Sequence, residues 1–314
     1  MTSRRAVRAS NARVDGIRVP AAVVRLGIRQ LGRRVLNPSL PWDVQRRRLE
    51  RITRPSILPK GTEVATRELN GVRSEVVTVG DARPDRTVVH FHGGGYCVGS
   101  ASTARTWAAH LSAMTACQVV LPEYRLAPEH PYPAALDDAR DALNELLNEA
   151  DPASIVLSGD SAGGGLALSL VLRLRDEGHR LPAGCILLSP WLDLGRDRRA
   201  TPDLVRRDVL LSPGWLEACA RAYANPSQWV DHSVSPLFAA HKGLPPLLIQ
   251  AGSDELLAPD AEYLAASASA ADSDVTYTSW PRMWHDFQLQ AGLVAAADSA
   301  LSQAAWFVTT VTRS

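Results

Sequence analysis

The sequence predicts an α/β fold in which helices cover both faces of a mostly parallel central sheet. From about residue 65, short runs rich in β-branched residues alternate with segments of helical periodicity. Several of the short runs are apolar throughout, which is typical of strands that are buried on both faces. Together, the alternation and the apolar runs favour parallel strands joined by helical crossovers.

Seven strands and five helices follow from this pattern. The predicted strands lie at 74–80, 86–92, 118–124, 154–160, 184–190, 246–252 and 275–280. Helical patterning lies at 102–116, 132–150, 162–178, 258–270 and 292–311. The interval 192–243 is too long for a simple connection and contains a helix-like stretch over 201–224. We expect it to form a helical cap insertion above the sheet.

The net charge of +1 conceals a strong asymmetry along the chain. Residues 1–60 carry 15 Lys and Arg against 3 Asp and Glu, and the remainder carries 19 against 30. Such a block could contact nucleic acid or an anionic membrane, or could lie on an acidic body. Apolar residues recur at helical spacing among the arginines, at Val23, Leu26, Ile28, Leu31 and Val35. We expect this amphipathic helix to dock on its own protein, with no nucleic-acid partner.

Targeting and redox features favour a cytoplasmic protein. Arg4-Arg5 is not followed by the apolar run of a secretory signal, and no stretch approaches the ~20 apolar residues of a membrane span. We therefore expect neither a signal peptide nor stable membrane insertion. The four cysteines are scattered and suggest neither a zinc site nor a disulfide framework. We expect no metal site.

Residues 159–163 read Gly-Asp-Ser-Ala-Gly and lie where a predicted strand meets a predicted helix. This G-x-S-x-G pattern is typical of a nucleophile elbow, a sharp turn that exposes a serine oxygen above the sheet. Gly159 and Gly163 would let neighbouring segments approach closely, and the helix N-terminus would direct N–H groups toward Ser161. A glycine-rich turn of this kind can also bind phosphate, so the pattern alone leaves both interpretations open.

A second glycine-rich segment, His92-Gly93-Gly94-Gly95, follows the predicted strand at 86–92. Peptide N–H groups in such a loop can stabilise the charge that develops on a carbonyl oxygen during acyl transfer. Ala162 would supply a further N–H donor, and His92 would hold the loop by hydrogen bonds. The two glycine motifs, in this order, favour acyl transfer over phosphate binding.

A serine nucleophile needs a base and a carboxylate that orients the base. His285 follows the last predicted strand, and Asp254 lies just beyond the end of the preceding strand. The order Ser161, Asp254, His285 is the one expected of this kind of sheet. Asp254 is favoured because it comes first after its strand. Three neighbouring carboxylates compete for the same role: Glu255, which is the main rival, Asp260 and Asp286.

Five blocks extend the pattern over about residues 60–310: HGGGYCVGS, PEYRLAPEHPYPAALDDA, GDSAGGGLAL, GSDELL and WHDF. In this order they resemble the hormone-sensitive-lipase-like branch of the α/β-hydrolases, and bacterial carboxylesterases in particular. The resemblance implies an α/β-hydrolase fold in which Ser161 is the nucleophile, His285 the base and acid, and Asp254 its orienter. It also implies an oxyanion hole made by the N–H groups of Gly93, Gly94 and Ala162.

The resemblance has consequences for the two ends of the chain. It implies that residues 1–60 form an arginine-rich helical cap segment, which with the insertion at 192–243 covers a catalytic domain at 61–314. Many members have Asp-Pro-Leu where this chain has Asp254-Glu255-Leu256, which loosens the assignment of the acid. The family also often pairs through its last strand, so we expect a homodimer through residues 275–280.

The predicted function is that of a serine carboxylesterase acting on short-chain acyl esters through an acyl-enzyme intermediate, without a cofactor. The preference for short acyl groups comes from the resemblance alone. An amidase or deacetylase acting on acylamides would use the same residues. A non-catalytic ligand receptor on the same scaffold is disfavoured because the serine, histidine and acidic candidates are all present.

Overall fold

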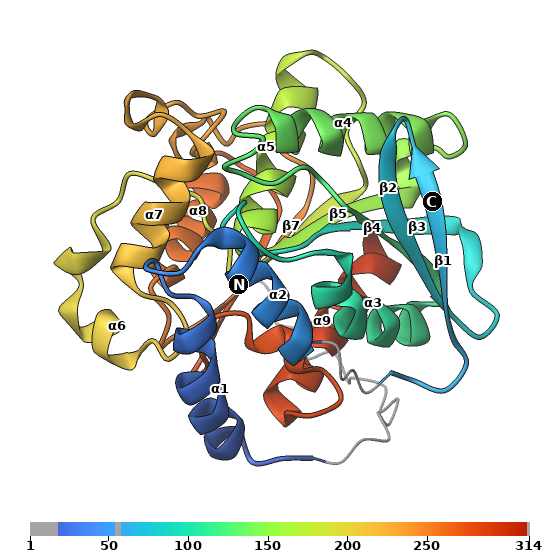
Figure 1. The fold of residues 1–314 in the computed structure, drawn as a ribbon. Coiled ribbons are helices and arrows are strands. Elements are labelled where there is room, and N and C mark those ends of the chain that lie inside the picture. The colour runs from blue at the N-terminus through green and yellow to red at the C-terminus, as the bar shows by residue number, and fades with distance from the viewer. Residues whose placement is uncertain (1–17, 54–57, 313–314) are drawn as a thin grey trace, which may run out of the picture.

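The computed structural model describes residues 18–53 and 58–312, and its centre is one eight-stranded sheet (Figure 1). The strand order is β1-β2-β4-β3-β5-β6-β7-β8. The bounds are β1 (Thr62–Leu69), β2 (Val72–Val79), β3 (Arg83–Phe91), β4 (Cys117–Pro122), β5 (Ile155–Asp160), β6 (Gly184–Leu188), β7 (Leu247–Gly252) and β8 (Val275–Trp280). β1 and β2 are antiparallel to their neighbours, whereas β3 to β8 run parallel. The prediction of a mostly parallel sheet is confirmed.

Helices cover both faces of the sheet. α4 (Ala134–Leu147), α5 (Ala162–Asp176) and α8 (Ala258–Ala270) pack on one face, and α3 (Ala101–Thr115) and α9 (Ala295–Val311) on the other. β7 shows why a strand between two layers of helices is apolar throughout. Leu247 and Ile249 enter the core beneath α8, and Leu248 enters the core beneath α9.

Two elements within the described residues were not predicted from the sequence. β1 is an edge strand paired only with β2, and most of its side chains are exposed, so it lacks a buried apolar stripe. α2 (Trp42–Thr53) is rich in arginine, and only one of its residues, Gln45, is buried. In both elements the apolar periodicity that identifies a helix or strand is weak.

The predicted helix-like stretch at 201–224 is two helices, α6 (Pro202–Arg207) and α7 (Pro213–Tyr223). Asp208 interrupts it, because its buried carboxylate accepts hydrogen bonds from the N–H groups of Leu210 and Leu211. Ser212 then caps α7 by accepting a hydrogen bond from the N–H of Trp215. The loop between the two helices comes close to the pocket described below.

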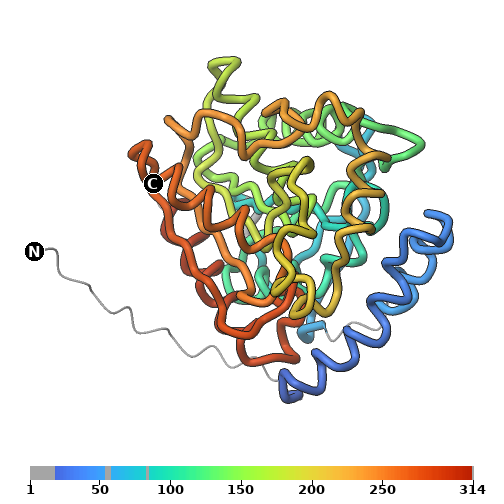
Figure 2. The backbone as a smooth tube through the Cα atoms, turned by 90° about the vertical axis from the view of Figure 1, so that its left-hand side faces the viewer, coloured from blue at the N-terminus to red at the C-terminus, as the bar shows by residue number. Residues whose placement is uncertain are grey.

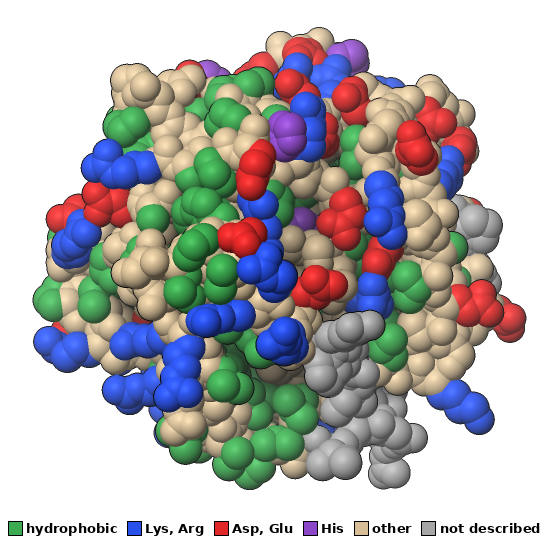
Figure 3. Space-filling model, in the orientation of Figure 1, with side chains coloured by type: hydrophobic (Ala, Val, Ile, Leu, Met, Phe, Trp, Pro, Cys, Tyr) green, Lys and Arg blue, Asp and Glu red, His purple; other side chains and the backbone are tan. Residues whose placement is uncertain are grey.

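The N-terminal helices α1 (Ala21–Val35) and α2 lie together on one flank of the molecule (Figure 2). Gly32 and Val35 of α1 are buried, whereas Val23, Leu26 and Leu31 remain largely exposed. Arg and Lys side chains gather over this flank (Figure 3). Residues 1–17 of the arginine-rich segment predicted from the sequence lie outside the described residues.

Candidate active site

Ser161 lies at a sharp turn between β5 and α5. Its backbone has φ 53° and ψ −120°, a conformation that L-residues rarely adopt and that is found at functional turns. The flanking glycines are required by close contacts. A Cβ at Gly159 would lie 2.1 Å from the carbonyl oxygen of Gly163, and one at Gly163 would lie 2.0 Å from that of Phe91. The strand-turn-helix arrangement therefore matches a nucleophile elbow.

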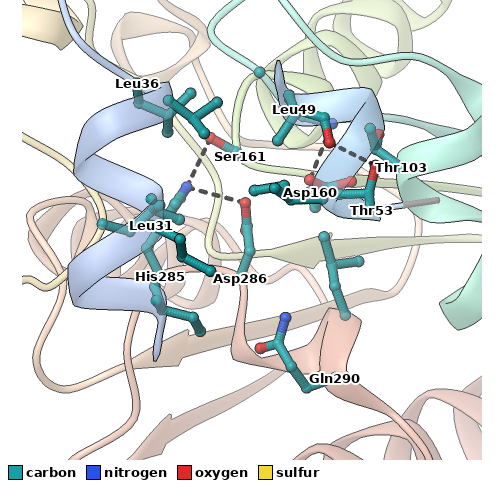
Figure 4. Close-up of a pocket in the computed structure, with 18 of the residues that line it drawn as sticks. Leu31, Leu36, Leu49, Thr53, Thr103, Asp160, Ser161, His285, Asp286 and Gln290 are labelled. Carbon is teal, nitrogen blue, oxygen red and sulfur yellow. Dashed lines mark hydrogen bonds and ion pairs between the residues drawn. The ribbon is translucent and has the colours of Figure 1, made fainter. Parts of the chain in front are cut away.

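His285 lies in the loop after β8, and its Nε2 atom is 2.9 Å from Ser161 Oγ (Figure 4). Both side chains are almost completely buried. With the Ser161 hydroxyl as donor, Nε2 accepts its hydrogen bond, which is the geometry that a general base requires. The structure thus brings together the two predicted residues, which are 124 positions apart in the sequence.

Asp254 does not contact His285, contrary to the expectation from the sequence. Its Oδ2 atom accepts a hydrogen bond from Arg25 at 2.8 Å, and its Oδ1 atom one from Arg207 at 3.2 Å. The next residue takes the predicted place, because Glu255 Oε2 is 3.6 Å from His285 Nδ1. Consecutive side chains in the turn after β7 point in different directions, so the first carboxylate after the strand meets arginines of α1 and α6, and the second faces His285.

Asp260, another carboxylate considered from the sequence, does not face His285 and has other partners. Asp260 is completely buried, and its Oδ2 atom accepts a hydrogen bond from Arg198 at 2.7 Å. The N–H groups of Leu192 and Asp193 donate to the same oxygen. Asp260 therefore secures the start of the 192–243 interval.

Glu255 is completely buried and is held by Ser189, whose hydroxyl donates to Glu255 Oε2 at 2.9 Å. Within the described residues, His285 Nδ1 and Glu255 Oε1 have no hydrogen-bond partner. A small approach of these two side chains would pair His285 Nδ1 with Glu255 Oε2, and catalytic hydrogen bonds are often long before substrate binds. Ser189 was missed from the sequence, although its position directly after β6 was a usable signal.

Asp286 also faces the base, since its Oδ2 atom is 3.1 Å from His285 Nε2. Burial raises the pKa of Asp286 to about 7, against the opposing effect of His285. Burial lowers the pKa of His285, but the Asp286 and Glu255 carboxylates outweigh it, so this pKa lies well above its ordinary value. Asp286 therefore favours the protonated form of the base.

The glycine loop differs from the expectation at its first glycine. The Gly93 N–H donates to Asp160 Oδ2 at 2.9 Å and is thereby committed to the scaffold. The N–H groups of Gly94 and Ala162 donate no hydrogen bond within the described part of the chain. Gly94 has φ 120°, and a Cβ there would lie 2.0 Å from the carbonyl oxygen of Val98, so this loop needs glycine.

His92 and Gly95 connect the glycine loop to neighbouring parts of the fold. The His92 ring lies stacked on Tyr124, and its Nδ1–H donates to the Gly93 carbonyl at 2.7 Å. Burial lowers the pKa of His92, which favours the neutral ring that this contact uses. A Cβ at Gly95 would lie 2.6 Å from Cys219 Sγ, so α7 packs directly against the loop.

A pocket of about 520 Å³ opens above Ser161 and His285. Its walls come largely from aliphatic side chains of the two N-terminal helices and of the residue that follows α1, namely Val24, Ile28, Leu31, Leu36, Leu49 and Ile52. Figure 4 shows Leu31 and Leu36 of the α1 segment on one side of the Ser161–His285 pair and Leu49 of α2 on the other. Trp215 of α7 also lines this pocket, while Trp284 is buried in the core.

No helix among the described residues is long and apolar enough to cross a membrane.

Asp160, whose role the sequence did not indicate, completes the buried polar framework of the site. Its Oδ1 atom lies 3.0 Å from His90 Nε2, while Oδ2 accepts from Gly93. The residue between glycine and serine in the elbow thus connects β5 to the glycine loop.

Comparison with known proteins agrees with this geometry. Residues 88–289 match a family model described as the alpha/beta hydrolase fold. The chain is 38% identical over 259 residues to an esterase of Acinetobacter venetianus, covering 81% of this chain and 85% of that protein. It is 36% identical over 248 residues to an acetyl-hydrolase of Streptomyces hygroscopicus, covering 76% and 83%.

Comparison with solved structures also finds esterases. The fold matches a crystal structure of an esterase from the bacterial hormone-sensitive lipase family with a TM-score of 0.87 and 32% identity. The match covers 94% of this chain and 100% of the other. The chain therefore belongs to the α/β hydrolase fold family, in its hormone-sensitive-lipase branch.

Proposed function

We propose that this carboxylic ester hydrolase cleaves short-chain acyl esters through an acyl-enzyme intermediate on Ser161. The observation that carries the proposal is the 2.9 Å contact between Ser161 Oγ and His285 Nε2 inside an apolar pocket. The names of two similar proteins, an esterase and an acetyl-hydrolase, support a short acyl group. An apolar wall favours a neutral substrate over a charged one.

In the acylation step, His285 Nε2 takes the proton of Ser161 while Oγ bonds to the ester carbonyl carbon. The N–H groups of Gly94 and Ala162 stabilise the oxyanion, which places Gly93 in a supporting role. Glu255, and not Asp254, orients His285 and stabilises its protonated ring. The imidazolium then gives the proton to the leaving alcohol, and the C–O bond to that alcohol breaks.

In the deacylation step, water replaces the alcohol. His285 removes a proton from the water, and the resulting oxygen nucleophile attacks the acyl carbon under the same N–H donors. Collapse of the intermediate returns the proton to Ser161 and releases the carboxylic acid. These steps need only the groups of this chain and water.

The N-terminal segment of residues 1–60 and the insertion at 192–243 form the cap in this proposal, over a catalytic domain at 61–314. Support comes from the pocket, whose lining combines residues of α1 and α2 with Leu210, Leu211 and Trp215 of the insertion. A Cβ at Gly32 of α1 would lie 2.5 Å from Leu210 Cδ1, so the two parts pack closely. The cap therefore forms the acyl or alcohol site.

The proposal is tested by hydrolysis of a chain-length series of p-nitrophenyl esters. Ser161→Ala should lose at least about 10⁴-fold in kcat, because it lacks the nucleophile. Ser302→Ala, which removes a hydroxyl of α9 that does not line the pocket, is the matched control and should keep the wild-type rate. An inactive wild type, or an unchanged rate in Ser161→Ala, would refute the proposal.

An acylamide substrate is the second candidate, because the name acetyl-hydrolase fits an ester or an amide. Comparing p-nitrophenyl acetate with p-nitroacetanilide separates the two. A higher kcat/KM on the anilide would assign the chain to amide hydrolysis. A non-catalytic receptor role is disfavoured by the short Ser161–His285 contact, which a ligand-binding scaffold does not need.

We also propose a homodimer that pairs through β8, the edge strand at the opposite end of the sheet from β1. Light scattering should then give twice the mass of 33.9 kDa at micromolar concentration, and a monomeric mass over the whole concentration range would refute the homodimer.

A cytoplasmic location is supported by the four cysteines, which are free and buried thiols.

A further inference from the structure

Arg25 of the cap helix α1 contacts three separate segments of the chain. Its Nη1 atom donates to Asp254 Oδ2 and to the carbonyl oxygen of Arg282, both at 2.8 Å. Its Nη2 atom donates to the carbonyl oxygen of Arg207, also at 2.8 Å. One guanidinium thus joins α1 to the turn after β7, to the loop that carries His285 and to the end of α6.

Asp254 is the shared acceptor of two cap arginines. Arg25 bonds to one carboxylate oxygen and Arg207 to the other. The Asp254 side chain is only 10% exposed and that of Arg25 26%, so water screens this pair less than an ordinary surface pair. Asp254 is also the immediate neighbour of Glu255, so the same turn holds both the cap and the orienting acid.

Besides Arg25, one buried side and a few polar contacts hold α1, including the Val19 N–H just before the helix, which donates to the Leu293 carbonyl oxygen at 2.9 Å. Val23, Leu26 and Leu31 are more than half exposed, so apolar burial secures the helix only along one side. Arg33 donates to the carbonyl oxygen of Asp208 at 2.7 Å and provides a second tether near the C-terminal end. Since α1 supplies a wall of the pocket, these arginine contacts contribute to the geometry of that wall.

We propose that Arg25 and Asp254 are positioning residues whose ion pair fixes α1 over the pocket and thereby sets the affinity for longer acyl chains. The kinetic part of this inference rests on the proposed ester hydrolysis. The pair acts through the pocket wall and the His285 loop, and neither residue touches the reacting atoms. Asp254 thus has a role in this chain other than that of the triad acid.

Hydrogen exchange measures the proposed clamp directly. In Arg25→Gln and in Asp254→Asn, amides of residues 21–35 should exchange about tenfold faster, while those of β5 and β6 keep their protection. Arg29→Gln is the matched control, because it removes a charge from the same helix at an exposed side chain without a hydrogen bond or ion pair among the described residues. Equal exchange over 21–35 in all four proteins would overturn the proposal.

Kinetics then test the consequence for substrate binding. Both variants should raise KM for p-nitrophenyl hexanoate by about tenfold and for the acetate by less, because the longer chain contacts α1. In the double variant, the second substitution should add little, since the two residues form one contact. Arg25→Lys should fall in between, because an ammonium replaces part of the guanidinium contacts. Additive effects, or equal changes for both esters, would contradict the proposal.

The two experiments separate this inference from the proposed function. If the wild type hydrolyses no ester, the function proposal fails, and hydrogen exchange still decides whether Arg25 and Asp254 hold α1. If ester hydrolysis is present but exchange and KM are insensitive to the pair, only the clamp is refuted. A plain loss of folding would instead lower the protection of every element, including β5 and β6.

Discussion

Glu255 Oε2 lies 3.6 Å from His285 Nδ1, on the opposite side of the imidazole from Ser161, whose Oγ contacts Nε2. Asp254, one residue earlier, binds Arg25 and Arg207 instead. The chain therefore places two adjacent carboxylates in two roles. In the proposed mechanism Glu255 orients His285, whereas Asp254 connects α1 and α6 to the turn that carries Glu255.

Asp286 should shift the pH dependence of the reaction. The base acts when neutral, so kcat/KM rises with pH through the pKa of His285, which the Asp286 carboxylate raises. Asp286→Asn removes that negative charge, lowers the pKa of His285 and should move the acidic limb to lower pH by about one unit. Asp176→Asn, an exposed change on α5, should leave the limb in place. An unchanged or upward-shifted limb in Asp286→Asn would contradict this assignment.

Ser189 should affect catalysis through Glu255. Its hydroxyl donates to Glu255 Oε2 and accepts from the Asp286 N–H at 3.2 Å. Ser189→Ala should lower kcat by about tenfold, because the acid loses one of its fixed partners. The control is Ser112→Ala, which removes another buried hydroxyl but lies against Cys117. If both variants lower kcat equally, the loss reflects stability and not the orientation of Glu255.

Arg46 should stabilise the glycine loop from the cap helix α2. It donates to the carbonyl oxygens of Cys97 and Ala127, each at 2.8 Å, and pairs with Glu129 at 2.7 Å. Arg46→Gln should lower kcat several-fold, since the N–H donors for the oxyanion lose support. Arg47→Gln, next to it and largely exposed, should keep kcat. A wild-type kcat in Arg46→Gln would show that the loop keeps its geometry without this contact.

Substitution by alanine should change the free energy of unfolding in opposite directions at Gly163 and at Gly27. A Cβ at Gly163 would lie 2.0 Å from the carbonyl oxygen of Phe91, so Gly163→Ala should reduce the free energy of unfolding by about 2–3 kcal/mol. A Cβ at Gly27 of α1 meets nothing within 4 Å, and Gly27→Ala should raise it by about 0.5–1 kcal/mol. Urea denaturation measures both, and a Gly163→Ala protein as stable as wild type would contradict the packing described for the elbow.

Much of the fold and half of the candidate site follow from local sequence. The strand-turn-helix around Ser161 was predictable because apolar periodicity and glycine spacing are local signals. His285 was predictable from its place after the last strand. β1 and α2 were not predicted, because an exposed edge strand and an arginine-rich helix carry little apolar periodicity.

The choice of acid depended on contacts across the fold. Asp254 and Glu255 differ by one position, and what separates them is Arg25, which lies 229 residues away in the sequence. Gly93 is a similar case, because its N–H is taken by Asp160, 67 residues away. Such pairings are set by tertiary packing, and a pattern of residue types along the chain does not contain them.

The most direct measurement of the central claim is kcat on p-nitrophenyl acetate for Glu255→Gln and Asp254→Asn, side by side. Glu255→Gln should lose about 10²–10⁴-fold, because the amide no longer stabilises the protonated His285. Asp254→Asn should stay within about tenfold of the wild type, since its carboxylate holds the cap. The reverse order, with the larger loss in Asp254→Asn, would contradict the assignment of both carboxylates.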